Sequence, residues 1–312
     1  MHILIDLQGA QSESRYRGIG RYALQFSLAL ARLARGQHRI ALLLNTAFAD
    51  TIDPLREAFA DLVADEDIHL WTPLTPCHAL DPANNWRRAA SEELYNAKIR
   101  QLQPDWLLIT SVFEGQWDGA VSAVGHSTVS TAVILYDLIP LIHKEKYLAH
   151  PVASCWYHHQ LAWLRNADFL LCISNSSAHE AIDYLNCPRD RLAVISSATD
   201  DRFRVINIEQ AKKEELVRKY GITRNIVIRA GEPTDSHKNV PNLIAAYSKL
   251  PQSIRQEHQL VLVYDVSEEA RKFLRTAAKQ HHLLDDELIL TGRVSDDDLV
   301  ALYNISTLSV FP

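Results

Sequence analysis

The segment GEPTDSHKNVPNLIAAY (231–247) follows a short apolar run and leads into a helix-like stretch. The run NIVIRAG (225–231) has the composition of a buried strand, and Pro241 is favoured in the first turn of a helix. Strand, polar loop and helix in this order form the repeating unit of a parallel α/β domain. At the helix start, Lys238 adds a cation where the macrodipole is already positive, an arrangement that favours an anion in front of it. We therefore predict that Lys238 binds a phosphate, the alternative being an ordinary surface lysine, and that the neighbouring Asn239 either caps the helix or donates a hydrogen bond.

Short apolar runs alternate with helix-period segments along the whole chain, so the fold class is α/β. Residues 200–208 are polar and without periodicity, and the alternation restarts after them. We predict two Rossmann-like domains, 1–203 and 204–312, each with a ligand-binding edge at the carboxyl ends of its strands. A helix is expected over SEELYNAKIRQL (91–102), starting at Ser91. The other expected strands are HILIDL (2–7), RIALLLN (39–45), DIHLW (67–71), WLLITS (106–111), STAVILYDL (130–138), FLLCIS (169–174), RLAVISS (191–197), HQLVLVYD (258–265), ELILTG (287–292) and LSVFP (308–312).

The composition is that of a globular protein in water, with 47% hydrophobic and 22% charged residues. A net charge of −6 and the lack of a long basic run argue against nucleic acid as a partner. No apolar run is long enough to span a membrane, and the N-terminus lacks the features of a signal peptide. We expect a cytoplasmic protein, peripheral at the inner membrane at most. The four cysteines are scattered and the histidine pairs are adjacent in sequence, so no metal site is predicted.

Two glycines lie between the first strand and the first long helix, in RYRGIGRY (15–22). Gly18 and Gly20 would let the backbone approach a ligand closely, and Arg15, Arg17 and Arg21 could meet its anionic groups. A tight turn with solvated arginines is the alternative. A dinucleotide-binding fingerprint fits poorly, because the glycines come too late after the strand and the expected acidic residue is missing.

Two further strand ends carry polar residues. YDLIPL (136–141) places Asp137 after a strand, where it either faces the cleft or caps the following turn. In TGRVSDDDLVALY (291–303), Ser295 is expected to cap a helix whose first turn is acidic. Residues 292–294 then form a loop that is open to a ligand.

Taken in order, these motifs resemble the GT4 family of retaining, nucleotide-sugar-dependent glycosyltransferases, which have the GT-B architecture of two Rossmann-like domains facing across a cleft. The resemblance covers essentially the whole chain, and it is closest to bacterial transferases that add mannose or related sugars to lipopolysaccharide or capsule. The matching segments are RGIGRYALQFSLAL, YDLIPL, ADFLLCISNSSAHEAI, VISSATDDRF, GEPTDSHKNVPNLIAAY and LTGRVSDDDLVALYNISTLSVFP.

The resemblance implies a role for residues of both domains. Lys238 would act on the departing diphosphate, and Asp137 would face the transferred sugar from the opposite domain, so these are the implied catalytic residues. Fixed cations and amides can stabilise the developing charge without a metal. The implied donor is a nucleotide sugar, GDP-mannose by preference, with no other cofactor, and the implied acceptor is a glycan or lipid-linked glycan. The implied diphosphate ligands are Gly18, Gly20, Arg21, Lys238 and Asn239, and the residues near the nucleotide base are Gly292, Arg293 and Val294.

The chain departs from the family pattern at several positions. Glu232 stands where members often have arginine, Tyr136 where many have histidine, and Ala198 where many have glycine. After Pro312 the family pattern continues into an EGFG-type turn and a paired-glutamate motif. We therefore expect the second domain to be incomplete, its sheet to be covered by a partner or further segment, and sugar transfer by these residues alone to be weak.

Three hypotheses of function follow. The first is a glycosyltransferase of this family. The second is a noncatalytic GT-B-like binding or partner domain that keeps the fold without turnover. The third is a nucleotide-cofactor oxidoreductase, which the poor fingerprint disfavours.

Overall fold

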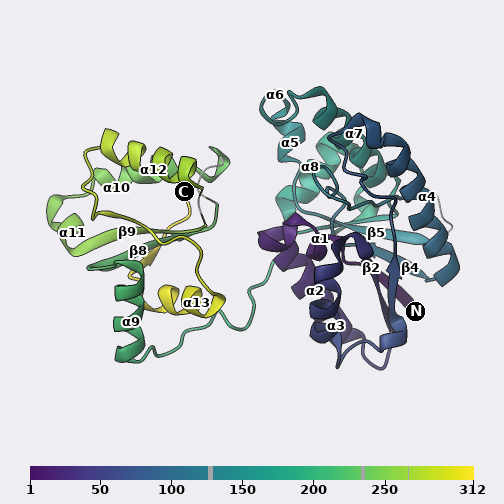
Figure 1. Ribbon diagram of the computed structural model, residues 1–312, viewed down its shortest axis with the longest axis horizontal. Coiled ribbons are helices and arrows are strands. Elements are labelled where there is room, and N and C mark those ends of the chain that lie inside the picture. Colours follow the sequence, from purple (N-terminus) through teal and green to yellow (C-terminus); the bar gives the residue numbers. More distant parts are fainter. Residues whose placement is uncertain (126–128, 233–235, 266) are drawn as a thin grey trace. The chain divides into compact units, whose positions relative to one another are not determined.

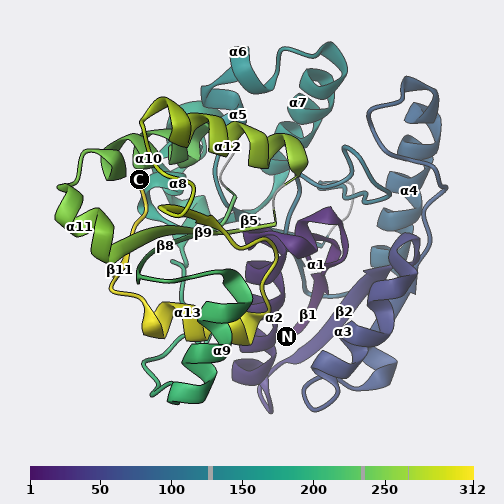
Figure 2. The same cartoon turned by 60° about the vertical axis from the view of Figure 1, so that its left-hand side comes forward.

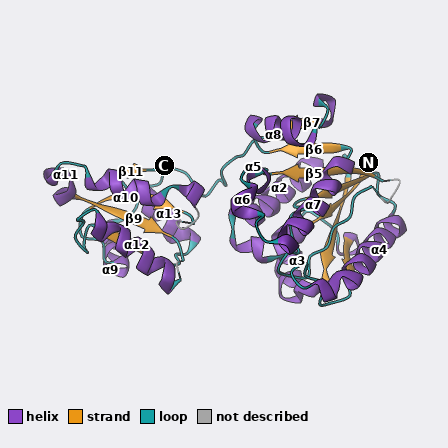
Figure 3. Cartoon of the chain, turned by 90° about the horizontal axis from the view of Figure 1, so that it is seen from above, coloured by secondary structure: helices purple, strands orange, loops and turns teal. Residues whose placement is uncertain are grey.

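The computed structural model describes residues 1–125, 129–232, 236–265 and 267–312 of the chain (Figure 1). It consists of two compact units, Met1–Ala198 and Thr199–Pro312. Each unit is built on one parallel sheet with helices on both sides (Figure 3), so the α/β prediction is confirmed. The sequence places the boundary between the domains after residue 203, in the polar stretch just beyond the end of the first unit.

The first unit contains a seven-stranded sheet in the order β3-β2-β1-β4-β5-β6-β7, and all neighbouring strands are parallel. Each predicted strand of this half is present. The strands are β1 (His2–Asp6), β2 (Arg39–Asn45), β3 (Ile68–Trp71), β4 (Trp106–Ile109), β5 (Ser130–Leu135), β6 (Phe169–Cys172) and β7 (Leu192–Val194).

Apolar side chains cover both faces of this sheet because successive strand residues point to opposite sides. Leu4 packs into a buried cluster with helices α4, α7 and α8, and Ile5 packs into a second cluster with α2 and α3. The helices of the unit are α1 (Gln8–Gln11), α2 (Gly18–Ala34), α3 (Ile52–Phe59), α4 (Asn85–Leu102), α5 (Ile139–Ile142), α6 (Lys144–Tyr147), α7 (Pro151–Asn166) and α8 (Asn175–Leu185).

Helix α4 corrects one prediction, because it begins at Asn85 and not at Ser91. Ser91 lies within α4, and its side chain is buried. Its hydroxyl donates to Arg87 O (2.7 Å) and accepts a hydrogen bond from the Leu74 amide (2.8 Å). A serine that bonds back to the carbonyl four residues earlier fits within a helix, so it need not mark the helix start.

The second unit contains a four-stranded parallel sheet in the order β10-β9-β8-β11. Helices α10 and α12 cover one face and α9 and α13 the other (Figures 1 and 2). That this unit is incomplete stays a prediction. Its strands are β8 (Asn225–Ala230), β9 (His258–Val263), β10 (Leu288–Leu290) and β11 (Leu308–Ser309), and its helices are α9 (Gln210–Tyr220), α10 (Val240–Ser248), α11 (Gln252–Glu257), α12 (Glu268–Gln280) and α13 (Asp296–Ile305).

The start of α13 holds a buried carboxylate. Ser295 caps the helix as predicted, accepting from the Asp298 amide (3.1 Å). The Asp298 carboxylate accepts a hydrogen bond from the Tyr220 hydroxyl (2.7 Å) and forms ion pairs with Lys219 Nζ (2.6 Å) and Lys212 Nζ (3.1 Å). All three residues belong to α9. Burial alone would raise the pKa of Asp298, but these bonds outweigh it and lower the pKa to about 2. The cluster therefore links α9 to α13 through charge as well as through apolar packing.

Asp298→Asn should lower the free energy of unfolding of the second unit by about 2 kcal/mol at pH 7, because the folded state favours the carboxylate. Because the folded pKa lies below the unfolded value, this stabilisation is complete well above pH 4. It disappears as the pH falls toward 2. All six tryptophans lie in the first unit, so urea unfolding should be followed by far-UV circular dichroism. A stability difference that stays constant from pH 7 to pH 3 would contradict the assignment.

Candidate functional site

The first loop, residues 7–17, joins β1 to α2 at the carboxyl edge of the first sheet. It contains α1 and a 3-10 turn at Glu13–Tyr16, and Gly18 is the first residue of α2. Gly20 is buried against this turn, where a Cβ atom would lie 2.4 Å from both Ser14 O and Arg15 Cα. Gly20 therefore serves close packing of the loop, whereas nothing lies within 4 Å of a Cβ built on Gly18.

The arginines of this loop and of the first turn of α2 differ in their surroundings. Arg15 was one of the three arginines predicted to meet an anionic ligand, but its charge is paired within the first unit: it forms a salt bridge with Asp50 (2.9 Å) and lies over the Tyr16 ring. Arg17 and Arg21 have exposed side chains. That these two arginines bind an anion stays a prediction.

A buried polar network fixes the beginning of the loop. Asp6, at the end of β1, accepts from the Tyr95 hydroxyl (2.7 Å) and from the Gln8 amide (2.9 Å). Gln8 in turn bonds the backbone of Val121 and the side chain of Asn45. Burial raises the pKa of Asp6 to about 6, although its hydrogen bonds favour the carboxylate. The network holds the ends of β1 and β2 to the segment after β4.

Glu114 holds the rest of the loop. Its carboxylate is buried and accepts three serine hydroxyls, from Ser12 (2.6 Å), Ser14 (2.9 Å) and Ser111 (2.7 Å). Burial raises the pKa of Glu114, which these bonds partly offset. The first loop is thereby joined to the segment after β4. Glu114 has no sequence signal beyond its position shortly after a strand.

The end of β5 is held by the start of α8. Ser174 caps α8 by accepting from the Ser177 amide (3.0 Å), and the Ser177 hydroxyl donates to Tyr136 O (2.5 Å). The Glu180 carboxylate accepts from the Leu138 amide (2.7 Å). The two residues on either side of Asp137 are therefore hydrogen-bonded to α8, which fixes the backbone position of Asp137.

Asp137 combines the two roles that its sequence leaves open. Its Oδ1 accepts from the Ile139 amide (3.1 Å), so it caps the turn after β5. It also lines a pocket of the first unit. The adjacent Tyr136 hydroxyl donates to Thr110 O (3.0 Å) and Ile19 O (3.3 Å), which joins the end of β5 to the first turn of α2.

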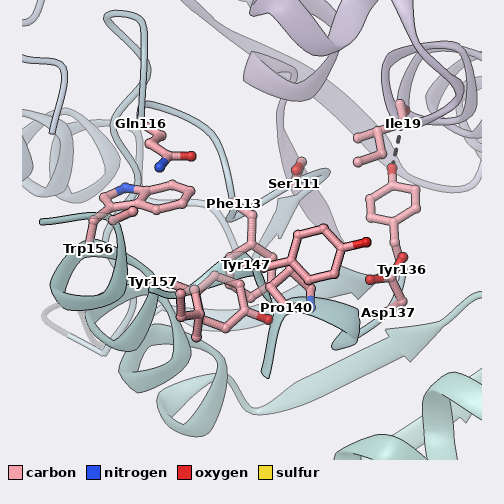
Figure 4. A pocket seen from close by; sticks show the side chains of 12 residues that line it. Ile19, Ser111, Phe113, Gln116, Tyr136, Asp137, Pro140, Tyr147, Trp156 and Tyr157 are labelled. Atoms are coloured by element: carbon pink, nitrogen blue, oxygen red, sulfur yellow. Dashed lines mark hydrogen bonds between the residues drawn. The ribbon is translucent and has the colours of Figure 1, made fainter. Parts of the chain in front are cut away.

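The pocket has a volume of about 270 Å³ and lies beyond the ends of β4 and β5 (Figure 4). Aromatic rings form much of its wall, and they come from the loop after β4, the α5–α6 segment and α7. None of the four rings beyond Tyr136 was a candidate from the sequence. The lining residues are Ile19, Ser111, Phe113, Gln116, Tyr136, Asp137, Pro140, Tyr147, Leu148, Ala153, Trp156 and Tyr157.

In the second unit, Lys238 ends a short 3-10 turn, Ser236–Lys238, directly before α10, and its side chain is exposed. Asn239 is the N-cap residue with a φ of 53°, and its side-chain oxygen accepts from Asn242 Nδ2 (2.7 Å). The helix start predicted from the sequence is confirmed. Residues 233–235 of the same loop lie outside the part of the chain that the structure describes.

The other predicted positions of this unit lie after β10. Gly292 has a φ of 73°, a conformation that favours glycine. Arg293 is exposed and Val294 is half-buried. The loops after β8 and β10 both leave the carboxyl edge of the sheet, because all its strands are parallel. Their roles toward a nucleotide stay predictions.

Arg229 is a buried cation at the end of β8. Its Nη1 donates to Gly231 O, and burial lowers the pKa of its guanidinium. Its Nε is buried without a hydrogen-bond partner among the described residues. Through this hydrogen bond Arg229 stabilises the turn at Gly231, where the segment between β8 and α10 begins.

Among the described residues, no group of three His, Cys, Asp or Glu side chains could hold a metal ion. Within the same ranges, none of the helices has the length and apolarity that crossing a membrane requires.

Gly20→Ala should lower the free energy of unfolding of the first unit by about 1–3 kcal/mol, because the added methyl group meets backbone atoms that cannot move cheaply. Gly18→Ala is the matched control and should change it by less than about 0.5 kcal/mol. Tryptophan fluorescence during urea unfolding reports this unit. Equal stabilities of the two variants would contradict the packing role of Gly20.

Comparison with known proteins finds glycosyltransferases among those similar to this chain. Residues 212–312 match the family described as glycosyl transferases group 1. The chain is 36% identical over 315 residues to a serotype-specific mannosyltransferase WbdA of Escherichia coli, a match that covers 100% of the chain and 37% of the relative. A second WbdA of Escherichia coli is 34% identical over 280 residues, covering 89% of the chain and 34% of the relative. The chain thus spans about a third of the length of the curated relatives it matches.

Solved structures share the fold at low sequence identity. WaaG, a glycosyltransferase involved in lipopolysaccharide biosynthesis, has a TM-score of 0.60 at 14% identity, with 100% of this chain and 75% of that chain covered. A glycosyltransferase from Rickettsia africae ESF-5 has a TM-score of 0.59 at 15% identity, with coverages of 99% and 72%. The chain therefore carries a group 1 glycosyltransferase domain, has the GT-B fold, and is a homologue of the WbdA mannosyltransferases.

Proposed function

We propose that this chain supplies the catalytic unit of a glycosyltransferase that moves mannose from GDP-mannose to a growing bacterial lipopolysaccharide or surface polysaccharide. The observation that carries the proposal is the 36% identity to a WbdA mannosyltransferase along the full length of the chain. The reaction is proposed to retain the anomeric configuration and to need no metal. We place it in the cytoplasm, with peripheral attachment to the inner membrane when the acceptor is lipid-linked.

The donor side of the proposal rests on the second unit. Lys238 is exposed at the start of α10, where the helix dipole adds to its positive charge. A nucleoside diphosphate becomes more negative as the sugar departs, so this position favours the transition state over the bound donor. Asn239 is proposed as a further diphosphate ligand, as are Gly18, Gly20 and Arg21 at the start of α2 in the first unit. The base is proposed to lie near Gly292, Arg293 and Val294.

The acceptor side rests on the first unit. Asp137 is held by the Ile139 amide and by the neighbouring α8 contacts, so its carboxylate has a defined position. It lines the aromatic pocket, which lies at the ligand-binding edge of the sheet. We propose that this carboxylate faces the reacting sugar and orients its hydroxyl groups.

Transfer should be measured with radiolabelled GDP-mannose and mannose-terminated oligosaccharides, with UDP-glucose, ADP-glucose and dTDP-glucose in parallel and with EDTA added to one set. We expect transfer from GDP-mannose that EDTA leaves unchanged, and an α-linked product by NMR. Binding of GDP-mannose without transfer to any acceptor would favour the noncatalytic binding domain instead. Transfer that stops in EDTA would contradict metal independence.

Lys238→Ala should weaken GDP binding by about 1.5–3 kcal/mol, the range for a hydrogen bond to a charged group. Lys249→Ala is the matched control, because Lys249 is an exposed lysine at the opposite end of the same helix. It removes the same charge and should leave the affinity within about 0.5 kcal/mol. Calorimetric titration of each variant with GDP provides the measurement. Equal affinities for GDP in Lys238→Ala and the parent chain would refute the role of Lys238.

A further inference from the structure

Ser196 has an unusual backbone conformation near the end of the first unit. Its φ is 57°, in the left-handed region that residues other than glycine rarely adopt. Gln103 and Asn186 also have positive φ values, but they are the C-cap residues of α4 and α8, where this conformation is common. Ser196 ends no helix, since it follows β7 and Ile195. Such a conformation persists only where the surrounding structure holds it in place.

The Tyr22 side chain supplies the contact that holds Ser196. Its hydroxyl donates a hydrogen bond to Ser196 O (2.7 Å), and we refer to this hydrogen bond as the latch. Two aromatic neighbours fix the direction of the Tyr22 ring. Phe26 stacks on it with centroids 5.9 Å apart, and Tyr136 meets it edge to face at 5.6 Å. The Tyr136 hydroxyl in turn donates to Ile19 O in the first turn of α2 (Figure 4).

The energy terms that oppose one another in the latch are similar in size. The left-handed conformation of a residue with a Cβ atom is disfavoured by roughly five- to thirtyfold relative to its ordinary conformations. A neutral hydrogen bond favours the state that contains it by roughly two- to twelvefold. Because these factors are comparable, removing the Tyr22 hydroxyl is expected to release Ser196 to a negative φ without unfolding the unit.

The segments before and after Ser196 determine what its release can affect. On the N-terminal side, the Ile195 amide donates to Cys172 O (2.9 Å), so the chain is tied to the sheet up to this residue. Residues 197–199 are exposed and form no hydrogen bond with the part of the chain that the structure describes. The chain is next tied down in the second unit, where Arg202 pairs with Asp296 (3.1 Å) of α13. Ser196 is therefore the last restrained residue before a short free connection.

We propose that the latch is a conformational restraint that fixes the direction in which the chain leaves the first unit. With the latch closed, Ser196 keeps its positive φ, and the connection at 197–199 starts from one direction. With the latch open, Ser196 relaxes, and the connection gains the conformational freedom of a further residue. The latch joins two residues of the first unit, so the inference does not depend on the proposed function.

The first test compares Ser196→Gly with Ser196→Ala, each made in the parent chain and in Tyr22→Phe. Glycine tolerates a positive φ, whereas alanine keeps the Cβ atom that disfavours it. In the parent chain, Ser196→Gly should therefore melt roughly 2–4 °C above Ser196→Ala. In Tyr22→Phe the order should reverse, because glycine at a residue with negative φ only adds freedom to the unfolded chain. Tryptophan fluorescence follows the melting of the first unit.

The second test is the distribution of radii of gyration of the whole chain, measured by small-angle X-ray scattering. This distribution should be broader in Tyr22→Phe than in the parent chain. Tyr184→Phe is the matched control, because it removes the hydroxyl of an exposed tyrosine of α8, and it should leave the distribution unchanged.

The inference is overturned if Ser196→Gly and Ser196→Ala melt in the same order with and without the Tyr22 hydroxyl. It is also overturned if the order reverses while the scattering of Tyr22→Phe matches that of the parent chain, since the hydrogen bond then restrains Ser196 alone. Neither measurement uses a nucleotide or a sugar, so a failure of GDP-mannose transfer leaves both results as they are.

Discussion

The buried carboxylate of Glu114 is the constraint on which the ligand-binding edge of the first unit depends. A carboxylate removed from water requires hydrogen-bond donors, and three serine hydroxyls supply them. Two of these serines belong to the loop before α2, and the third, Ser111, lines the aromatic pocket. Satisfying one side chain thus determines where the glycine-containing helix start lies and how one side of the pocket is shaped.

Much of the fold was predictable because it depends on local rules. Continuous apolar runs identified the strands of both sheets, and Ser295 marked the start of α13. The start of α4 was not predictable from Ser91, because this serine bonds within the helix and to Leu74, which is distant in sequence. A preference for helix caps cannot distinguish a buried serine of this kind from a true N-cap.

The candidate site likewise has one part that the sequence predicted and one part that it did not. Lys238 was placed at a helix start from sequence alone, since the strand, loop and helix that position it are consecutive. The pocket could not be found in that manner, because Phe113, Tyr147 and Trp156 come from separate segments with no common spacing. Only the packing of α7 and the α5–α6 segment beside the end of β5 brings such residues together. Asp137 shows a further limit, since one carboxylate both caps a turn and faces the pocket.

The position of all six tryptophans in the first unit has a consequence for spectroscopy. The second unit has no indole of its own, so every intrinsic tryptophan donor for energy transfer belongs to the first unit. If the second unit binds the proposed guanine nucleotide, its N-methylanthraniloyl derivative would accept tryptophan excitation energy only from the first unit. The efficiency of that transfer would then report the separation of the two units, without any label on the protein.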